Sequence, residues 1–376
     1  MISCTLYYTG AMSTRVYILG AGFSKPAGFP LAAELTDAVI ASYLEAAGDD
    51  EEFRSFVEHV KNVHGWLHRR NCRALGIEEF FLIAEQHIKF VRARHHMESV
   101  GRYDGETAYT ASEDVETWLG YLEDHLLDVL VERDERADLK PIHRLVESLR
   151  AEDEVISFNY DILFERACDD RGLPYWLGFE AQPKPQQPYV TLYKLHGSMD
   201  WVRPPRQQGQ VGHNLELLYR KKDANRERKK NTDPTGDAEY DHELVRIRDR
   251  HKMLQIIKDR DTTKNYWSGW AGLGDRKDVF LIPGLGELWH TARESLYNVE
   301  EIVIVGFSMS DQDLMARYTF GAFMKYRHDG EGPAPRVIVV APDASETVDR
   351  FQSVFGDAVK PIDKGHEEFD WSELNK

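Results

Sequence analysis

The chain has 376 residues, of which 42% are hydrophobic and 30% charged, and its formal net charge is -17 at pH 7. This composition is typical of a soluble globular protein of one large or two ordinary domains, and the negative charge argues against a general nucleic-acid-binding surface. No apolar run approaches the roughly 20 residues of a membrane span, and the N-terminus lacks a signal-peptide pattern. We therefore expect a cytoplasmic protein with no membrane partner.

Cysteine usage limits the metal chemistry that the sequence predicts. The chain contains Cys4, Cys72 and Cys168, which are far apart and form no C-x-x-C pair. Neither a disulfide framework nor a four-cysteine zinc site can be built from them. We accordingly expect no metal cofactor.

The first predicted strand covers residues 16–19 and runs directly into a glycine-rich turn. Gly20 and Gly22 lack a Cβ atom, so the backbone can turn sharply there and approach an anionic ligand such as a nucleotide diphosphate. The third glycine of a dinucleotide-binding fingerprint is replaced by Lys25. Taken alone, the segment favours nucleotide binding and a structural tight turn equally. Residues 1–12 are expected to be a leader, either disordered or preceding a start at Met12.

Apolar residues at helical spacing follow this turn. They predict helices over 31–44, 49–67, 77–91 and 115–131. We therefore expect residues 36–150 to form an inserted helical domain.

From residue 154 the pattern changes to short apolar runs that alternate with helical segments. Strands are predicted over 155–158, 191–195, 279–282, 301–305 and, as the last one, 336–340, with helices over 162–168, 288–296 and 313–324. This alternation is typical of an α/β fold with a Rossmann-like, mostly parallel sheet. The predicted sheet domain comprises residues 13–35 and 151–360, followed by an acidic tail, 361–376, that packs through Phe369 and Trp371 or trails free.

Residues 203–265 break this rhythm and are predicted to be a variable insertion. The stretch from Arg220 to Lys230 holds seven cations against two anions. A solvated face is the favoured interpretation of such a run, and a nucleic-acid or partner contact is the alternative.

Polar or glycine residues follow five of the predicted strands where they end. Because the carboxyl ends of parallel strands line one crevice, where ligands bind, we expect these residues to lie together. They are Gly20 to Ser24, Asn159 to Asp161, His196 to Ser198, Gly306 to Asp311, and Asp343.

The order and identity of these segments resemble the sirtuin-like (silent information regulator type) NAD-consuming proteins. The four segments are G-A-G-F-S at 20–24 with Gly28 and Pro30, S-F-N-Y-D at 157–161, L-H-G-S at 195–198 and V-G-F-S at 305–308. The resemblance is closest to bacterial sirtuin-like NADases of antiphage defence, which carry a helical insertion and often work in large assemblies. It implies a hydrolase that cleaves NAD to nicotinamide and ADP-ribose, an antiviral role through NAD depletion, a homo-oligomer, and a partner ATPase or translocase or a phage-derived trigger.

The chain departs from the deacylase branch of this family in two places. It has no C-x-x-C pairs for a structural zinc, and Leu31-Ala32-Ala33 follows Pro30 where deacylases carry Phe-Arg-Ser. NAD-dependent protein deacylation therefore becomes an alternative. Two others are a non-catalytic NAD- or ADP-ribose-sensing subunit of an ATPase-containing complex and a protein that acts on nucleic acid.

The resemblance assigns the central catalytic roles to Asn159 and His196. Cleavage of the bond between nicotinamide and ribose generates a sugar cation; an amide can orient a ribose hydroxyl or the attacking water, and an imidazole can accept a proton near neutral pH. Asp161 either stabilises the cation or caps the following helix. The structural alternatives are a turn histidine for His196 and a helix N-cap for Asn159. Since both lie in strand-end loops, we expect their substitution to leave the chain folded.

The remaining strand-end residues are expected to bind NAD. They are Gly20, Ala21, Gly22, Phe23, Ser24, Pro30, Gly197, Ser198, Gly306, Phe307, Ser308, Asp311 and Asp343. Local hydrogen-bonded turns are the alternative for the serines, and simple solvation is the alternative for the two aspartates.

Overall fold

A computed structural model of the chain describes residues 15–48, 50–69, 74–99, 108–179, 182–203, 215–220, 243–247, 267–268, 284–297, 299–310, 313–331, 334–357 and 359–375. The predicted leader, the predicted strand 279–282 and Asp311 lie outside these residues. So does most of segment 203–265, including all of the basic stretch except Arg220.

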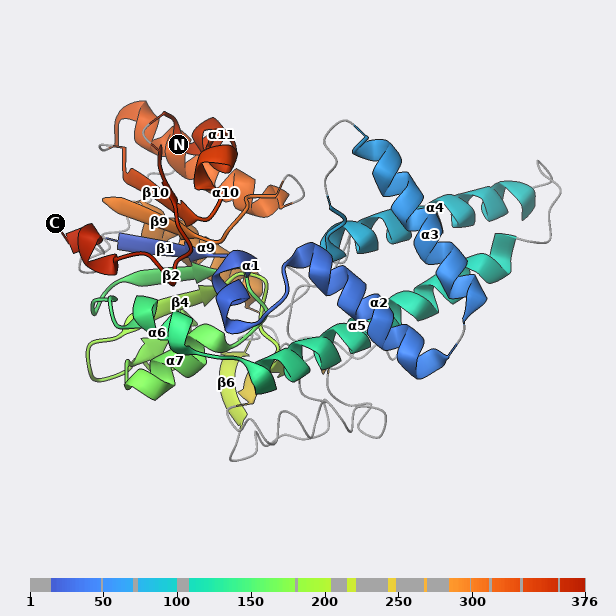
Figure 1. The fold of residues 1–376 in the computed structure, drawn as a ribbon, viewed down its shortest axis with the longest axis horizontal. Coiled ribbons are helices and arrows are strands. Elements are labelled where there is room, and N and C mark those ends of the chain that lie inside the picture. Colours follow the sequence, from blue (N-terminus) through green and yellow to red (C-terminus); the bar gives the residue numbers. More distant parts are fainter. Residues whose placement is uncertain are drawn as a thin grey trace, which may run out of the picture.

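A parallel sheet forms the centre of the described structure (Figure 1). Its seven strands lie in the order β11-β10-β9-β1-β2-β4-β3, and every pair of neighbours is parallel. This arrangement confirms the predicted α/β fold class. The strands are β1 (Arg15–Leu19), β2 (Glu154–Ser157), β3 (Tyr175–Trp176), β4 (Val190–Lys194), β9 (Glu301–Val305), β10 (Arg336–Ala341) and β11 (Val359–Asp363).

Strand β1 lies in the interior of the sheet, with β2 on one side and β9 on the other. All five of its residues are buried, as expected for a parallel strand that is covered on both faces. Its single charged residue, Arg15, is paired: Nε donates to Glu301 Oε1 at 2.6 Å and an Nη atom donates to the Leu374 carbonyl at 2.6 Å. The apolar run predicted at 16–19 is thus the core strand of the fold.

The strands that follow β1 in the sequence are added first on one side of it and later on the other side. The segments after β1 build β2, β4 and β3 outward on one flank, whereas β9, β10 and β11 extend the other flank. The boundary between β1 and β9 is therefore the topological switch point of the sheet. In open α/β sheets the loops at the carboxyl ends of such strands enclose the ligand crevice.

Helices surround this sheet. Helix α9 packs against β4, and α11 packs against β10 and β11. Helix α6 lies beside α7, although it falls within the predicted helical segment 36–150 (Figure 1). These helical elements are α1 (Ala21–Ser24), η1 (Lys25–Ala27), α6 (Lys140–Val146), α7 (Leu163–Arg171), α9 (Leu285–Leu296), α10 (Leu314–Tyr326), η4 (Arg327–Glu331), α11 (Ala344–Phe355) and η5 (Trp371–Asn375).

Four longer helices form a cluster beyond the carboxyl ends of the strands, on the side of the sheet where β1 runs into α1 (Figure 1). Aromatic pairs hold its interior, including Phe53 against Tyr43 at 4.3 Å and against Trp118 at 5.6 Å between ring centroids. The helices match the four predicted ones: the first, third and fourth extend beyond the predicted C-terminal ends, and the second begins two residues later than predicted. The domain boundaries at 36 and 150 stay a prediction. The four helices are α2 (Ala32–Ala47), α3 (Glu51–Leu67), α4 (Ile77–Ser99) and α5 (Ala108–Arg136).

Two strands of a second, antiparallel sheet lie within the predicted insertion 203–265, and its other two strands, 201–203 and 267–268, lie at or just outside the ends of that range. Its order is β6-β7-β5-β8, with β5 (Trp201–Arg203), β6 (Leu215–Arg220), β7 (Glu243–Ile247) and β8 (Trp267–Ser268). Among the described helices, none combines the length and apolar composition that crossing a bilayer requires.

The C-terminal segment differs from its prediction. Strand β10 is not the last strand, because Val359–Asp363 adds β11 to the edge of the sheet. Beyond it, Phe369 and Trp371 are buried, and the Trp371 ring lies 6.3 Å from that of Tyr17 in β1. Of the two possibilities for the tail, packing is the one that the structure shows.

Two glycine turns at the switch point are in direct backbone contact. Gly20 N donates to the Val305 carbonyl at 3.1 Å, and Gly22 N donates to the Gly306 carbonyl at 2.8 Å. A Cβ atom on Gly306 would lie 2.2 Å from Phe23 N, and one on Gly22 would lie 2.7 Å from Gly306 Cα. Gly306 also adopts a positive φ of 59°. Glycine is thus required because two backbones meet here.

This contact predicts the effect of Gly306→Ala on stability. Left-handed strain of roughly 1–2 kcal/mol and overpacking of roughly 1–3 kcal/mol should together lower the free energy of unfolding by about 3 kcal/mol, measured by urea denaturation. Gly321→Ala is the matched control, since Gly321 lies within α10 and a Cβ atom added to it would have no neighbour within 4 Å. It should leave stability unchanged or raise it by up to about 1 kcal/mol. Equal effects of the two substitutions would contradict the packing explanation.

Candidate active site

Ser24, Asn159 and Asp161 form one buried hydrogen-bonded cluster at the carboxyl ends of β1 and β2. Asn159 Nδ2 donates to the Gly20 carbonyl and to Ser24 Oγ, both at 3.0 Å, and Ser24 Oγ donates to Asp161 Oδ2 at 2.7 Å. The three side chains are 1–8% exposed. Because both N–H groups of Asn159 are used, its carbonyl oxygen is the atom that it can offer to a ligand.

Asp161 has a structural role at the start of α7. Its Oδ1 accepts from the backbone amide of Leu163, the first residue of that helix, at 3.1 Å. Burial raises the pKa of Asp161, against the opposing effects of Lys194, the Ser24 hydroxyl and the Leu163 amide. The helix-capping alternative is therefore present in the structure, and a role at the sugar cation stays a prediction.

His196 lies at the end of β4, the strand next to β2, and is 4% exposed. Its Nε2 is 3.2 Å from Asp313 Oδ2, and its Nδ1 is 3.9 Å from Glu78 Oε1. The Asp313 contact lacks hydrogen-bond geometry, and Nε2 has no hydrogen-bond partner among the described residues. Two carboxylates thus flank a buried imidazole that has one nitrogen left to bond.

Aromatic rings separate the imidazole from the sheet core. Phe158 lies 5.1 Å from His196 in a T-shaped arrangement and stacks on Phe307 at 4.5 Å with an interplanar angle of 15°. Trp289 lies 6.4 Å from His196 and donates its indole N–H to the Leu195 carbonyl at 2.7 Å. These contacts connect the loops after β2, β4 and β9, which carry three of the four motifs.

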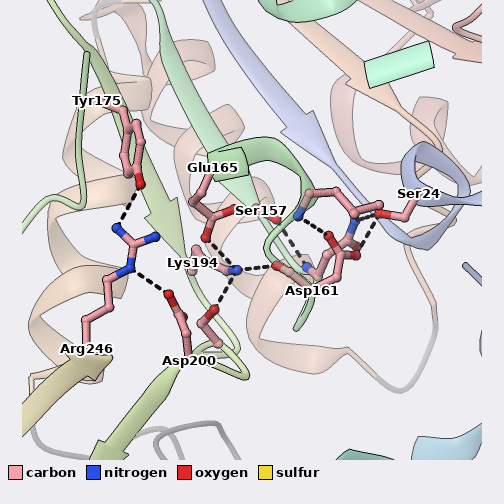
Figure 2. A network of polar contacts seen from close by, with 11 residues as sticks. Ser24, Ser157, Asp161, Glu165, Tyr175, Lys194, Asp200 and Arg246 are labelled. Atoms are coloured by element: carbon pink, nitrogen blue, oxygen red, sulfur yellow. Dashed lines mark hydrogen bonds and ion pairs between the residues drawn. The ribbon is translucent and has the colours of Figure 1, made fainter. Parts of the chain in front are cut away.

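A buried lysine holds the loops after β2 and β4 together (Figure 2). Lys194 Nζ donates to Glu165 Oε1 at 2.8 Å, to Ser198 Oγ at 2.7 Å and to the Asp161 carbonyl. Lys194 and Glu165 are 1% and 2% exposed, so the pair is fully enclosed. The three acceptors satisfy the ammonium group, which offsets the cost of burying its charge.

A second buried charged group, the Arg246 guanidinium, links the antiparallel sheet to the parallel sheet beside the Lys194 network. Arg246 of β7 donates to Asp200 Oδ2 at 2.6 Å and to the Tyr175 hydroxyl of β3 at 2.8 Å, as Figure 2 shows. The nearby carboxylate of Asp200 raises the pKa of Arg246 despite the opposing effect of burial. The second sheet is therefore fixed to the edge of the first beside the Lys194 network.

The structure brings some predicted site residues together and not others. The Ser24, Asn159 and Asp161 side chains meet, and Phe307 reaches His196 through Phe158. The Ser198 hydroxyl faces Lys194 instead. Ala21, Ser308 and Asp343 are exposed, and Pro30 is half-buried. The contact between the two turns explains why glycine is present at Gly20, Gly22 and Gly306, and a positive φ of 80° explains its presence at Gly197. The binding of these glycines to NAD stays a prediction.

Asn159 and His196 are buried, with exposed fractions of 8% and 4%, although both lie in strand-end loops. The Gly20 carbonyl and Ser24 would each lose a donor on removal of the Asn159 amide. A truncation to alanine at either position therefore carries a stability cost, and conservative substitutions test the chemistry more cleanly.

Several residues of this site have little sequence signal. Lys194 could have been found as a charged residue at an inward-facing position of an apolar strand, since both of its strand neighbours on that face are apolar. Glu78 and Asp313 come from α4 and from the cap of α10, and no local pattern connects them to His196. Tertiary structure alone places them there.

Comparisons with known proteins find structures but no family. No protein-family model matches the chain, and no curated protein matches it. Similar solved structures include a Sir2 homologue mutant in complex with ADP ribose, at 13% identity and a TM-score of 0.37, which covers 96% of this chain and 89% of that chain. A Sir2 homologue in complex with NAD has 14% identity and a TM-score of 0.37, covering 96% and 87%. Likeness at this level does not establish what the chain binds.

The buried Lys194–Glu165 pair predicts a large effect of Lys194→Met. Loss of the ammonium leaves the Glu165 carboxylate unpaired, which should lower the free energy of unfolding by about 3–5 kcal/mol. Burial already raises the pKa of Glu165, and loss of Lys194 raises it further. The protonated acid is then favoured in the folded state, so stability should be highest at acid pH and fall as pH rises above about 4.3, the value of an unfolded glutamate.

Denaturation of the variant across pH 5 to 8 measures this loss. Adding Glu165→Met should recover part of the stability because no buried charge remains. Lys325→Met, at an exposed i,i+4 pair with Asp329, is the control and should change stability by less than about 0.5 kcal/mol. A Lys194→Met variant as stable as this control would show that the pair is not needed.

Proposed function

We propose that the protein hydrolyses NAD to nicotinamide and ADP-ribose at the crevice between the carboxyl ends of β1, β2, β4 and β9. The observation that carries this proposal is His196, a buried imidazole with two carboxylates beside it and one nitrogen without a hydrogen-bond partner among the described residues. It stands one strand away from the Asn159 amide, whose carbonyl oxygen can accept a hydrogen bond. The ordered resemblance of four motifs to sirtuin-like NADases supports the choice of NAD.

In this proposal each group acts on the nicotinamide ribose. The Asn159 carbonyl oxygen accepts a hydrogen bond from the attacking water or a ribose hydroxyl and so orients it. His196 accepts the proton as water adds to C1 and the bond to nicotinamide breaks. Glu78 and Asp313 then stabilise the imidazolium that forms, as a buried carboxylate does for a catalytic histidine in other hydrolases. Ser24 and Asp161 are positioning residues that fix the Asn159 amide.

We further propose that this activity serves antiphage defence by depleting cellular NAD, in an oligomer that a partner or phage-derived trigger activates. The basis is the resemblance to the antiphage branch, together with a helical cluster of the kind that this branch carries. Cellular NAD measured after phage infection, in cells with the wild-type protein or its His196→Gln variant, tests this role. Equal NAD levels in the two strains would contradict it.

The catalytic proposal predicts the behaviour of His196→Gln. Loss of the proton acceptor should lower the rate of nicotinamide release from NAD by about 10²-fold or more, measured by chromatography with and without the protein encoded beside it. His290→Gln is the control, since His290 is an exposed histidine of α9, and it should keep the wild-type rate. Thermal melts verify that both variants are folded.

The same assay separates the alternatives. Wild-type turnover by His196→Gln would show that the chemistry is misassigned. If an acylated peptide is added and deacylated peptide forms at the same rate as nicotinamide, the protein is a deacylase. NAD binding without nicotinamide release under any activating condition would identify a sensor.

A further inference from the structure

Two histidines and a glutamate meet where α3 ends and α4 begins. His64 lies in the last turn of α3 and His68 caps that helix one turn later, so both face the same side. Their rings are 4.6 Å apart between centroids. Glu79, in the first turn of α4, places Oε2 3.3 Å from His64 Nε2 and Oε1 2.6 Å from His68 Nε2.

The cluster is enclosed, and one of its nitrogens is unsatisfied. His64 is 6% exposed and Glu79 5%, while His68 opens partly to solvent. His68 Nε2 has hydrogen-bond geometry to Glu79, but His64 Nε2 has no hydrogen-bond partner within the part of the chain that the structure describes. A buried nitrogen left in this way costs roughly 1–3 kcal/mol. A simple His68–Glu79 hydrogen bond therefore leaves the position of His64 unexplained.

We propose that His64, His68 and Glu79 bind one divalent transition-metal ion, with zinc as the first candidate. Two histidines four residues apart on a helix and a carboxylate from a second helix are a known type of zinc ligand set, which leaves a fourth position for water. Imidazole donors favour zinc and its neighbours over Mg²⁺ and Ca²⁺. The three ligand atoms all lie within 4.8 Å of one another.

The distances suit such an ion. Two bonds of about 2.1 Å in tetrahedral geometry place ligand atoms about 3.4 Å apart, close to the 3.3 Å between His64 and Glu79. The 2.6 Å contact between His68 and Glu79 must open by about 0.8 Å to match. His68 is the most exposed of the three and stands at the helix terminus, where such a shift is easiest.

The bound ion would join the end of α3 to the start of α4. This site shares no residue with the proposed NAD chemistry, although Glu79 directly follows Glu78, which lies beside His196. The signal for it in the sequence is the spacing of His64 and His68 within and just beyond the predicted helix 49–67. The expectation of no metal rested on cysteines alone and did not consider this pair.

The test is a titration of the full-length protein, first stripped of metal with a chelator, with Co²⁺ and then with competing Zn²⁺. We expect one equivalent of Co²⁺ to bind with the visible absorption of a four-coordinate centre and to be displaced by Zn²⁺. His64→Gln and Glu79→Gln should each weaken binding by at least about tenfold. Zn²⁺ should also raise the melting temperature of the wild type and not of these variants. His59→Gln, which removes an exposed histidine of the same helix, should match the wild type in every measurement.

The proposal is overturned if the wild type binds no equivalent of either metal, or if His64→Gln and His59→Gln bind equally well. Should His64→Gln fail to fold, His68→Gln decides the question, because this partly exposed residue can be replaced with less disturbance. Wild-type affinity in that variant would equally exclude the site.

Discussion

The arrangement of the loops at the carboxyl ends of the strands depends on the contact between two backbones at the centre of the sheet. The turns after β1 and β9 approach so closely that neither Gly22 nor Gly306 has room for a Cβ atom. This contact sets the position of Phe307, which stacks on Phe158, which in turn packs against His196. The contact between the two glycine turns is thus linked to the imidazole through Phe307 and Phe158.

Charge is the second constraint on this part of the molecule. Parallel strands that are covered on both faces normally contain apolar residues, yet β4 ends in Lys194 and β1 begins with Arg15. Each is satisfied by several acceptors from different elements, so neither charge is left unpaired. The Lys194 ammonium group connects the loops that carry Asp161 and Ser198. Hydrogen bonds therefore hold these two loops together, as apolar packing holds other parts of the core together.

The sequence predicts five of the seven strands of the parallel sheet, because each is a local apolar run, and the rule for parallel sheets predicts that their carboxyl ends converge. The apolar runs at 16–19, 155–158 and 191–195 and the rule for parallel sheets predict that Gly20, Asn159 and His196 lie at the same end of the sheet. Strand β11 was missed because Lys360 and Pro361 interrupt its apolar pattern. The glycines were expected to make room for a ligand, whereas their packing partner is another turn, which sequence spacing cannot show. The carboxylates beside His196 come from distant helices, and only the assembled fold identifies them.

The first turn of α4 carries two adjacent carboxylates with different neighbours. Glu78 points toward His196, and Glu79 lies between His64 and His68. Consecutive residues of a helix are rotated by about 100°, so each carboxylate keeps its neighbour only in one helical phase. A rotation of α4 about its own axis would move both carboxylates away from their neighbours at once. One helical phase of α4 thus serves two sites together, and His68 of the second site lies in the connection between α3 and α4.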